Sequence, residues 1–361
     1  MPAKEATPLS LALDRRVEEG ALGTLYEKLP GNEVRCYACA HRCLIKDGLR
    51  GICKVRYNRA GTLMVPRGYV GALQCDPIEK KPFFHAFPGR DALTFGMLGC
   101  DLHCSYCQNW VTSQALRDPG ALTEPMDITP RQLVEIAKSR QASVVATSYN
   151  EPLITSEWAV EVFKEARPRG FSTAYISNGN ATREVLEFIR PFTDLYKIDL
   201  KSFRDKNYRS LGGKLENIVN GIRMVHEMGF WLEIVTLIIP GFNDSDEELG
   251  DIARFLAGLS PSIPWHVTAF HKDYKMQDPD NTTPETLLRA ARIGEAAGLQ
   301  YIYAGNLPGR VGRYEDTRCP NCKTTLIRRI GYRILEDRLS GSGRCVRCGL
   351  KIPGVWSVRS D

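Results

Sequence analysis

From residue 92 onward, apolar runs that read as buried strands alternate with segments that read as helices. The apolar runs predict seven strands, with bounds at 93–98, 143–148, 172–177, 195–200, 231–239, 265–270 and 300–304. The segments between them predict helices at 130–139, 157–169, 181–190, 215–228, 244–257 and 284–297. Strands that alternate with helices of this length imply right-handed crossovers and a parallel sheet. The predicted fold class is therefore α/β.

Helix signals support these bounds. Thr129 is expected to cap the first of these helices, with Pro130 at its first position. Gly170 and Gly229 end two of the later helices. In parallel α/β proteins the reactive groups gather at the carboxyl ends of the strands. Polar residues that directly follow a predicted strand are therefore the candidates for a functional site.

The first predicted strand runs directly into a CxxxCxxC motif made by Cys100, Cys104 and Cys107. Three thiolates on one loop can hold three irons of a [4Fe-4S] cube and leave the fourth iron without a protein ligand. A small molecule can chelate that iron, and S-adenosylmethionine (SAM) is the candidate. The alternatives are three buried thiols or a zinc knuckle completed by His103. Structural zinc usually takes four protein ligands, commonly as paired CxxC units, so the cluster is favoured.

Polar residues follow the next three strands. Glu151 follows the second strand, and Ser177 and Asn178 follow the third. Asp199 and Lys201 end the fourth strand on one face, because strand side chains alternate. Charges on one face of an apolar strand are costly unless they are paired or in use. An ordinary capped turn is the alternative at each position taken singly, but a series of such ends in chain order indicates a site.

The fifth and sixth strands end in further candidates. Asn243 begins the helix that follows the fifth strand. His271 lies at the exit of the sixth strand, which favours it as a site residue, whereas His266 within that strand is more often a satisfied core histidine.

Two further cysteine sets flank this region. Cys319, Cys322, Cys345 and Cys348 have the CxxC…CxxC spacing of a zinc ribbon, for which a rubredoxin-like iron site is the chemical rival. A unit so small, beginning near residue 314, needs a metal to fold. The N-terminal set is Cys36, Cys39, Cys43 and Cys53, which indicates zinc, slightly favoured, or an auxiliary iron-sulfur cluster. Disulfides are disfavoured for a reducing compartment, and Cys75 stands alone.

The chain has 361 residues, of which 43% are hydrophobic, enough for one large domain with small appendages. We expect an N-terminal extension at 1–89, a core at 90–313 and a C-terminal unit at 314–361. No apolar stretch is long enough to span a membrane, and the N-terminus lacks a secretory signal, so a cytoplasmic location is expected. The net charge of +6 permits an anionic partner but demands none.

The CxxxCxxC loop resembles that of the radical SAM superfamily, and residues 199–201, Asp-Leu-Lys, resemble a triplet of glycyl-radical-enzyme activases. Glu151-Pro152 matches the end of a Gly-Gly-Glu-Pro segment, with Tyr149-Asn150 in place of the glycines. Other segments resemble the radical SAM member of the AmmeMemoRadiSam system, related to pyruvate formate-lyase activating enzyme. They are 36–43, 76–82, 149–152, 265–266, 271–276 and 305–309. The resemblance covers nearly the whole chain.

The resemblance implies a partial (β/α)6 TIM-like barrel that cleaves SAM reductively. A one-electron donor such as flavodoxin or ferredoxin would reduce the cluster, and a 5′-deoxyadenosyl radical would then remove hydrogen from a substrate. The implied cluster ligands are Cys100, Cys104 and Cys107. Tyr106 would pack near the adenine, and the residues that position SAM would be Glu151, Ser177, Asn178, Asp199 and Asn243. Lys201, His271 and Lys275 would lie on the substrate side.

Three functions compete at this point. The favoured one is radical chemistry on a protein or peptide, as activases perform. The second is radical modification of RNA or a small metabolite. The third is a zinc-ribbon protein that binds nucleic acid without catalysis, which leaves the polar strand ends unexplained. Memo-like and AMMECR-like proteins are the expected partners, no membrane is expected, and nucleic acid is not excluded.

Overall fold

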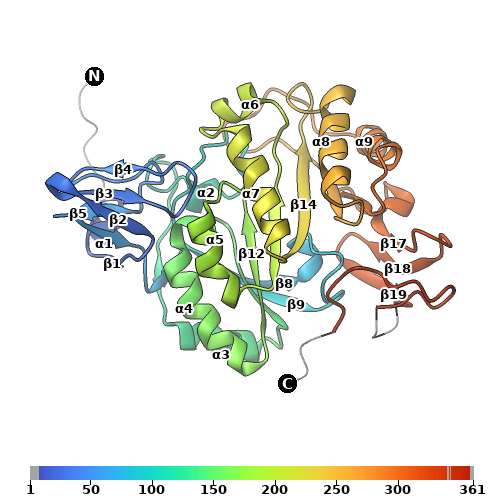
Figure 1. The fold of residues 1–361 in the computed structure, drawn as a ribbon, viewed down its shortest axis with the longest axis horizontal. Helices are drawn as coiled ribbons and strands as arrows, with labels where there is room; N and C mark the ends of the chain where they lie inside the picture. The colour runs from blue at the N-terminus through green and yellow to red at the C-terminus, as the bar shows by residue number, and fades with distance from the viewer. Residues whose placement is uncertain (1–7, 340, 342, 358–361) are drawn as a thin grey trace.

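The computed structural model describes residues 8–339, 341 and 343–357. Its centre is one sheet of eight strands (Figure 1). Seven of them run parallel and are β9 (Asp91–Gly96), β11 (Val144–Thr147), β12 (Ser172–Ser177), β13 (Leu195–Asp199), β14 (Trp231–Ile238), β15 (Trp265–Ala269) and β16 (Ile302–Gly305). An eighth strand, β8 (Ala72–Pro77), pairs antiparallel with β9 at one edge. The seven parallel strands match the predicted apolar runs, and the α/β class is confirmed.

Helices between the parallel strands pack on one face of this sheet. They are α3 (Pro130–Ser139), α4 (Ser156–Ala166), α5 (Arg183–Ile189), α7 (Leu215–Glu227), α8 (Asp246–Leu259) and α9 (Pro284–Ala296). α3 begins as predicted, because the Thr129 hydroxyl accepts from the Gln132 amide and the Gln132 side chain accepts from the Thr129 amide. The short α6 (Asp205–Ser210) was not predicted. No helix in the described part of the chain is both long and apolar enough to cross a membrane.

The opposite face of the sheet, here called the inner face, carries polar side chains that include Lys197, Asp199 and Thr268. Along β13, Tyr196 and Ile198 pack under the helices, whereas Leu195, Lys197 and Asp199 lie on the inner face. This alternation gives each strand one face for the core and one face for a site.

Residues 78–87, here called the inner-face segment, follow β8 and cover the inner face near the amino ends of the strands. Their apolar side chains share a core cluster with the first residues of β11 and β13. The Glu233 carboxylate of β14 accepts hydrogen bonds from the amides of Phe84 and His85 at 3.0 and 2.9 Å. The carboxyl-end half of the inner face therefore stays open for a cavity.

The N-terminal unit lies on the opposite side of the core from the C-terminal strands (Figure 1). It contains α1 (Pro8–Glu18) and two antiparallel sheets. The strands of the first sheet are β1 (Ala21–Leu22), β6 (Thr62–Val65) and β5 (Tyr57–Arg59). The strands of the second sheet are β2 (Tyr26–Leu29), β3 (Glu33–Cys36) and β4 (Leu44–Ile45). A further pair is β7 (Tyr69–Val70) with β10 (Met126–Asp127). The expected extension at 1–89 thus includes β8 and the inner-face segment, which the structure places with the core.

A buried ion pair joins the N-terminal unit to α4. Arg56 donates to both carboxylate oxygens of Glu157, at 2.7 and 2.9 Å. Replacing Arg56 with methionine would leave this buried carboxylate without its partner, so we expect the free energy of unfolding to fall by about 3–5 kcal/mol in urea denaturation. Arg67→Met is the matched control, because the exposed Arg67 pairs with Glu161 on the same helix and should contribute less than about 1 kcal/mol. Equal losses in the two variants would contradict this prediction.

The C-terminal unit contacts β16, at one edge of the core sheet, and the inner-face segment. Its strands are β17 (Thr317–Arg318), β18 (Thr325–Ile330) and β19 (Arg333–Asp337). The chain turns between β18 and β19 at Gly331, where φ is +58°. The buried Arg329 guanidinium donates to the Phe84 carbonyl at 3.0 Å, and Thr317 bonds Tyr303 of β16. The unit therefore connects β16 with the inner-face segment.

Candidate active site

A cavity of about 380 Å³ lies on the inner face at the carboxyl ends of the parallel strands. The cysteine loop, residues 100–107, forms one part of its wall, and residues 79–82 of the inner-face segment form another. The volume is in the range of small-molecule sites, about 300–1,000 Å³. The cavity thus lies at the edge of the sheet where the sequence predicted a site.

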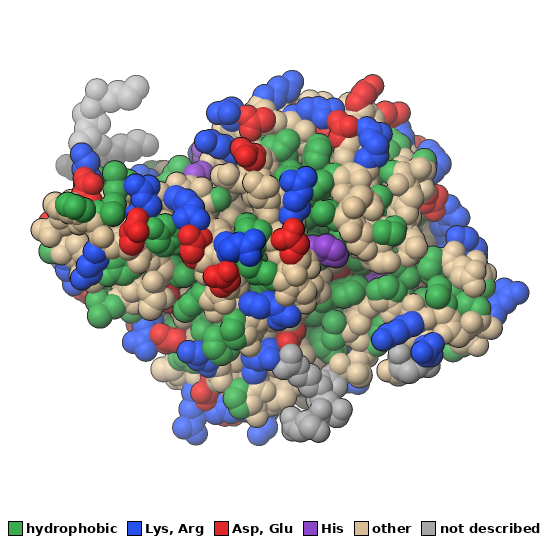
Figure 2. Space-filling view, in the orientation of Figure 1, with side chains coloured by type: hydrophobic (Ala, Val, Ile, Leu, Met, Phe, Trp, Pro, Cys, Tyr) green, Lys and Arg blue, Asp and Glu red, His purple; other side chains and the backbone are tan. Residues whose placement is uncertain are grey.

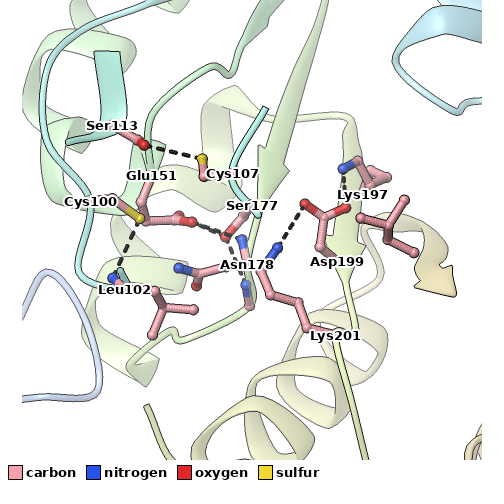
Figure 3. Close-up of polar contacts among 12 residues, drawn as sticks. Cys100, Leu102, Cys107, Ser113, Glu151, Ser177, Asn178, Lys197, Asp199 and Lys201 are labelled. Atoms are coloured by element: carbon pink, nitrogen blue, oxygen red, sulfur yellow. Dashed lines mark hydrogen bonds and ion pairs between the residues drawn. The ribbon is translucent and has the colours of Figure 1, made fainter. Parts of the chain in front are cut away.

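The three cysteines of the loop all line this cavity. Cys104 is buried, and Cys100 and Cys107 are half-buried. The Leu102 amide donates to the Cys100 sulfur at 3.4 Å, and the Cys107 sulfur lies 3.2 Å from the Ser113 hydroxyl (Figure 3). Burial raises the pKa of Cys104 to about 11, so this thiol does not ionise by itself at neutral pH. A bound metal replaces the thiol proton, and the three sulfurs therefore fit a metal-cluster site.

The loop cysteines differ in arrangement from the C-terminal cysteines. Sulfur ligands of one tetrahedral zinc lie about 3.8 Å apart, as follows from a Zn–S bond of about 2.3 Å. Within residues 8–339, 341 and 343–357, the only Cys, His, Asp or Glu set gathered for one ion is Cys319, Cys322, Cys345 and Cys348. Neither the loop cysteines nor the N-terminal cysteines are gathered in this way in the described residues.

Asp101 ties the cysteine loop to the turn after β12. Its fully buried carboxylate accepts hydrogen bonds from the Asn178 and Asn180 side-chain amides, both at 2.7 Å. The sequence reasoning did not single out Asp101, although a carboxylate inside an apolar cysteine motif must find partners if it is buried. Asp101 therefore fixes the position of the loop relative to the core sheet.

Three predicted site residues, Glu151, Ser177 and Asn178, meet at the Glu151 carboxylate. Its carboxylate accepts from the Ser177 hydroxyl and the Asn178 amide at 2.7 Å each, and from the Leu153 amide at 3.1 Å (Figure 3). Burial, reinforced by the Asp101 carboxylate, raises the pKa of Glu151 to about 8. Glu151, Ser177 and Asn178 thus lie together on the cavity wall. A cationic group bound beside Glu151 would favour its ionised form.

Asp199 lies between two lysines at the end of β13. It bonds the ammonium group of Lys197, and its other oxygen lies 3.5 Å from the ammonium group of Lys201 (Figure 3). Burial raises the pKa of the Cys104 and Cys107 thiols, and the Lys201 ammonium opposes that rise in both. Lys201 therefore lies on the cysteine side of the cavity.

Other predicted residues occupy different places. Tyr106 lines the cavity and packs edge-on against Phe242, with ring centroids 5.9 Å apart. Asn243 is buried outside the cavity wall, and its side-chain amide donates to the Lys201 and Leu237 carbonyls at 2.8 Å each. Asn243 therefore holds the strand ends that carry Lys201.

The histidine that lines the cavity is His266 of β15, whereas the sequence favoured His271. His271 is exposed at the rim, with its Nε2 atom 2.9 Å from the side-chain nitrogen of Gln108. Lys275 is also exposed and pairs with Asp118 at 2.9 Å. His266 is buried and satisfied by Glu233 at 2.7 Å, as expected of a core histidine, but it also lines the cavity.

The C-terminal cysteines form a compact ligand set. The ligand atoms of all four lie within 4.8 Å of one another, and the sulfurs of Cys319 and Cys348, and of Cys322 and Cys345, are 3.6 Å apart. Hydrogen bonds from Thr324 lower the pKa of Cys322 to about 6, which favours the thiolate that binds a metal. The N-terminal set of Cys36, Cys39, Cys43 and Cys53 is mostly buried, and its metal binding stays a prediction.

Comparisons with known proteins agree with this site. The family model described as Radical SAM superfamily matches residues 95–256. The uncharacterized protein MJ0808 of Methanocaldococcus jannaschii is 36% identical over 330 residues, which are 91% of this chain and 97% of that protein. The chain therefore contains a radical SAM domain, which implies a [4Fe-4S] cluster and SAM.

The chain is also homologous to pyruvate formate-lyase-activating enzymes. The enzyme of Staphylococcus aureus strain USA300 is 25% identical over 226 residues, or 57% of this chain and 88% of that enzyme. A solved domain of pyruvate formate-lyase-activating enzyme from Bacteroides vulgatus ATCC 8482 is 24% identical, with a TM-score of 0.41, and the match covers 45% of this chain and 98% of that one.

Proposed function

We propose that the protein cleaves SAM reductively at a [4Fe-4S] cluster held by Cys100, Cys104 and Cys107 and removes hydrogen from a protein or peptide. The observation that carries this proposal is that the three cysteines open onto the same cavity as the polar ends of β11, β12 and β13. The cluster, when bound, supplies the electron and the open iron at which SAM is split. The parallel sheet would be the partial (β/α)6 TIM-like barrel of this class.

Different residues of the cavity wall would bind or lie near different groups of SAM. The Glu151 carboxylate, fixed by Ser177 and Asn178, would accept the amino group of SAM, and a bound ammonium group would keep that carboxylate ionised. Asp199 and Lys201 supply opposite charges near the cysteines. The inner-face segment closes the far end of the cavity, which limits the access of water to reactive species.

The proposal extends to further metals. The C-terminal unit would be a zinc ribbon, because its four sulfurs have the spacing of one tetrahedral zinc site. The N-terminal cysteines would bind zinc or an auxiliary iron-sulfur cluster. Both the Cys43 and the Cys53 sulfur lie beside Gly51. A Cβ atom at Gly51 would be 3.7 Å from the Cys43 sulfur and 3.8 Å from the Cys53 sulfur.

The proposed partners follow from the electron requirement and the sequence resemblance. An external donor such as flavodoxin or ferredoxin would supply the electron in the cytoplasm. The substrate or assembly partners would include Memo-like and AMMECR-like proteins, within the AmmeMemoRadiSam system. His271 and Lys275 lie exposed at the rim, where a macromolecular substrate would approach.

The surface gives less support to a nucleic-acid partner. On the helix-covered face in Figure 2, Lys and Arg side chains are interspersed with Asp and Glu side chains. Binding of nucleic acid relies on gathered positive charge that displaces counterions. In the described residues, this face therefore offers no gathered positive charge, and RNA modification stays the second candidate behind action on a protein.

The test uses protein reconstituted with iron and sulfide without oxygen. The EPR spectrum of the reduced protein should change when SAM is added, and dithionite should drive the formation of 5′-deoxyadenosine and methionine in equal amounts. A protein that binds no cluster, or whose cluster spectrum ignores SAM, would refute the proposed chemistry. Appearance of a new organic radical on a candidate partner protein would identify the activase-like substrate.

A further inference from the structure

Two buried lysines from different elements line the same cavity. Lys81 belongs to the inner-face segment and Lys197 to β13, and both line the wall. Each side chain is only 6% exposed. Burial lowers the pKa of Lys81, and repulsion from the Lys197 ammonium contributes to the lowering. An ammonium group is costly to keep charged in a buried place unless an anion accompanies it.

The carboxylates beside these lysines are shared. Asp76 lies 3.0 Å from the ammonium of Lys80 and 3.1 Å from that of Lys81. Asp199 is likewise shared between Lys197 and Lys201. Two carboxylates thus serve four ammonium groups, and each lysine pair keeps one positive charge in excess.

The other carboxylates of the wall are occupied. Glu79 accepts from the Gly89 amide at 2.9 Å and lies 3.8 Å from the buried Arg329 guanidinium. Glu151 is bonded by its own strand-end partners on the cysteine side. Neither carboxylate bonds Lys81 or Lys197, so Asp199 is the one carboxylate of the cavity wall that bonds either lysine.

Tyr149 holds Lys81 in place. The Tyr149 hydroxyl accepts a hydrogen bond from the Lys81 ammonium at 3.0 Å, and the ammonium lies 5.0 Å from the centre of the ring. Tyr149 has a φ of +67°, an unfavourable conformation for a bulky residue and one that glycine would adopt freely. Strain of this kind persists at sites where the surroundings require the side chain.

We propose that Lys81 and Lys197 bind an anionic oxygen group of the substrate, a carboxylate or a phosphate, at the cavity wall, with Tyr149 as a positioning residue. This inference rests on the proposed function and adds the chemical class of the substrate to it. An anion held between the two lysines would direct the rest of the substrate toward the cysteine side, where hydrogen is to be removed.

The probes are inorganic phosphate and succinate, added to SAM-saturated protein without reductant at low ionic strength. SAM then fills its own carboxylate site, and the titration calorimeter reports further anion binding. Lys81→Met and Lys197→Met should each lower the affinity for the probe by about tenfold or more, because a charge-assisted hydrogen bond is lost. In Lys81→Met, Asp76 still pairs with Lys80, and in Lys197→Met, Asp199 still pairs with Lys201. Neither variant therefore leaves an unpaired carboxylate.

Two further variants separate the charge from the fold. Lys81→Arg keeps the charge and should retain binding, whereas Lys138→Met removes an exposed lysine on α3 and should change nothing. Tyr149→Phe should lower the affinity for the probe several-fold and leave the melting temperature unchanged, because this variant loses only the hydroxyl that holds Lys81. A loss of melting temperature without a change in probe affinity would mean that Tyr149 is merely structural and would overturn its positioning role.

The outcomes distinguish this inference from the proposed function. Tighter binding of phosphate would indicate a phosphate group in the substrate, and tighter binding of succinate a carboxylate. If the wild-type protein binds neither probe, or if Lys81→Met and Lys197→Met bind them as well as wild type, the anion site is wrong. Lysine-dependent anion binding in a protein that forms no 5′-deoxyadenosine would support the anion site and overturn the SAM chemistry.

Discussion

Cys104→Ala should reduce the formation of 5′-deoxyadenosine to background. Cys104 is the buried member of the cysteine loop and lines the cavity beside Lys201. With two thiolates left, the loop can no longer hold three irons of a cube, so both the cluster and its SAM-dependent EPR change should be lost. The measurement combines iron and sulfide content, EPR, and product formation with dithionite as reductant.

The matched control for this variant is Cys75→Ala. Cys75 is half-buried on β8 and belongs to none of the three cysteine sets. It should keep the cluster, the zinc and full activity, which shows that the loss follows from the loop and not from any missing thiol. A Cys104→Ala protein that still cleaves SAM reductively would refute the assignment of the cluster ligands.

The parallel core could be predicted because its strands are buried on both faces. Val144, Val145 and Ala146 of β11 are all fully buried, so the strand appears in the sequence as an uninterrupted apolar run. β8 gives no such signal, because it lies at the edge, half exposed, and contains Gln74 and Asp76. Its pairing with β9 depends on the fold of the whole chain.

The candidate site was predictable only where a residue directly follows a strand. Glu151 and Ser177 meet on the cavity wall because parallel strands end at one edge of the sheet. Lys81 precedes the first parallel strand, and only the tertiary fold brings it to Tyr149. Asn243 also follows a strand, but its amide is used by the Lys201 and Leu237 carbonyls, a distinction that the sequence alone does not make.

Cys322→Ala should remove zinc from the C-terminal unit and destabilise the protein. Cys322 lies in the four-sulfur set, and Cys319 and Cys345 of the same set belong to a core cluster with Phe84 and Tyr303. Because a unit this small depends on its metal, we expect a loss of about 3 kcal/mol or more, or about 6 °C or more in melting temperature. Zinc content by mass spectrometry and melting by circular dichroism would test this.

The damage should also reach the cavity, because the C-terminal unit anchors the inner-face segment. Arg329 of β18 donates to the Phe84 carbonyl, and the Val355 and His85 backbones bond each other at 2.8 Å. If these anchors loosen, Lys81 should lose its fixed position, so anion binding should weaken while the iron content of the cysteine loop stays unchanged. Unaltered zinc stoichiometry in Cys322→Ala would reject the ribbon, and full zinc loss with unaltered melting would show that the inner-face segment is held without it.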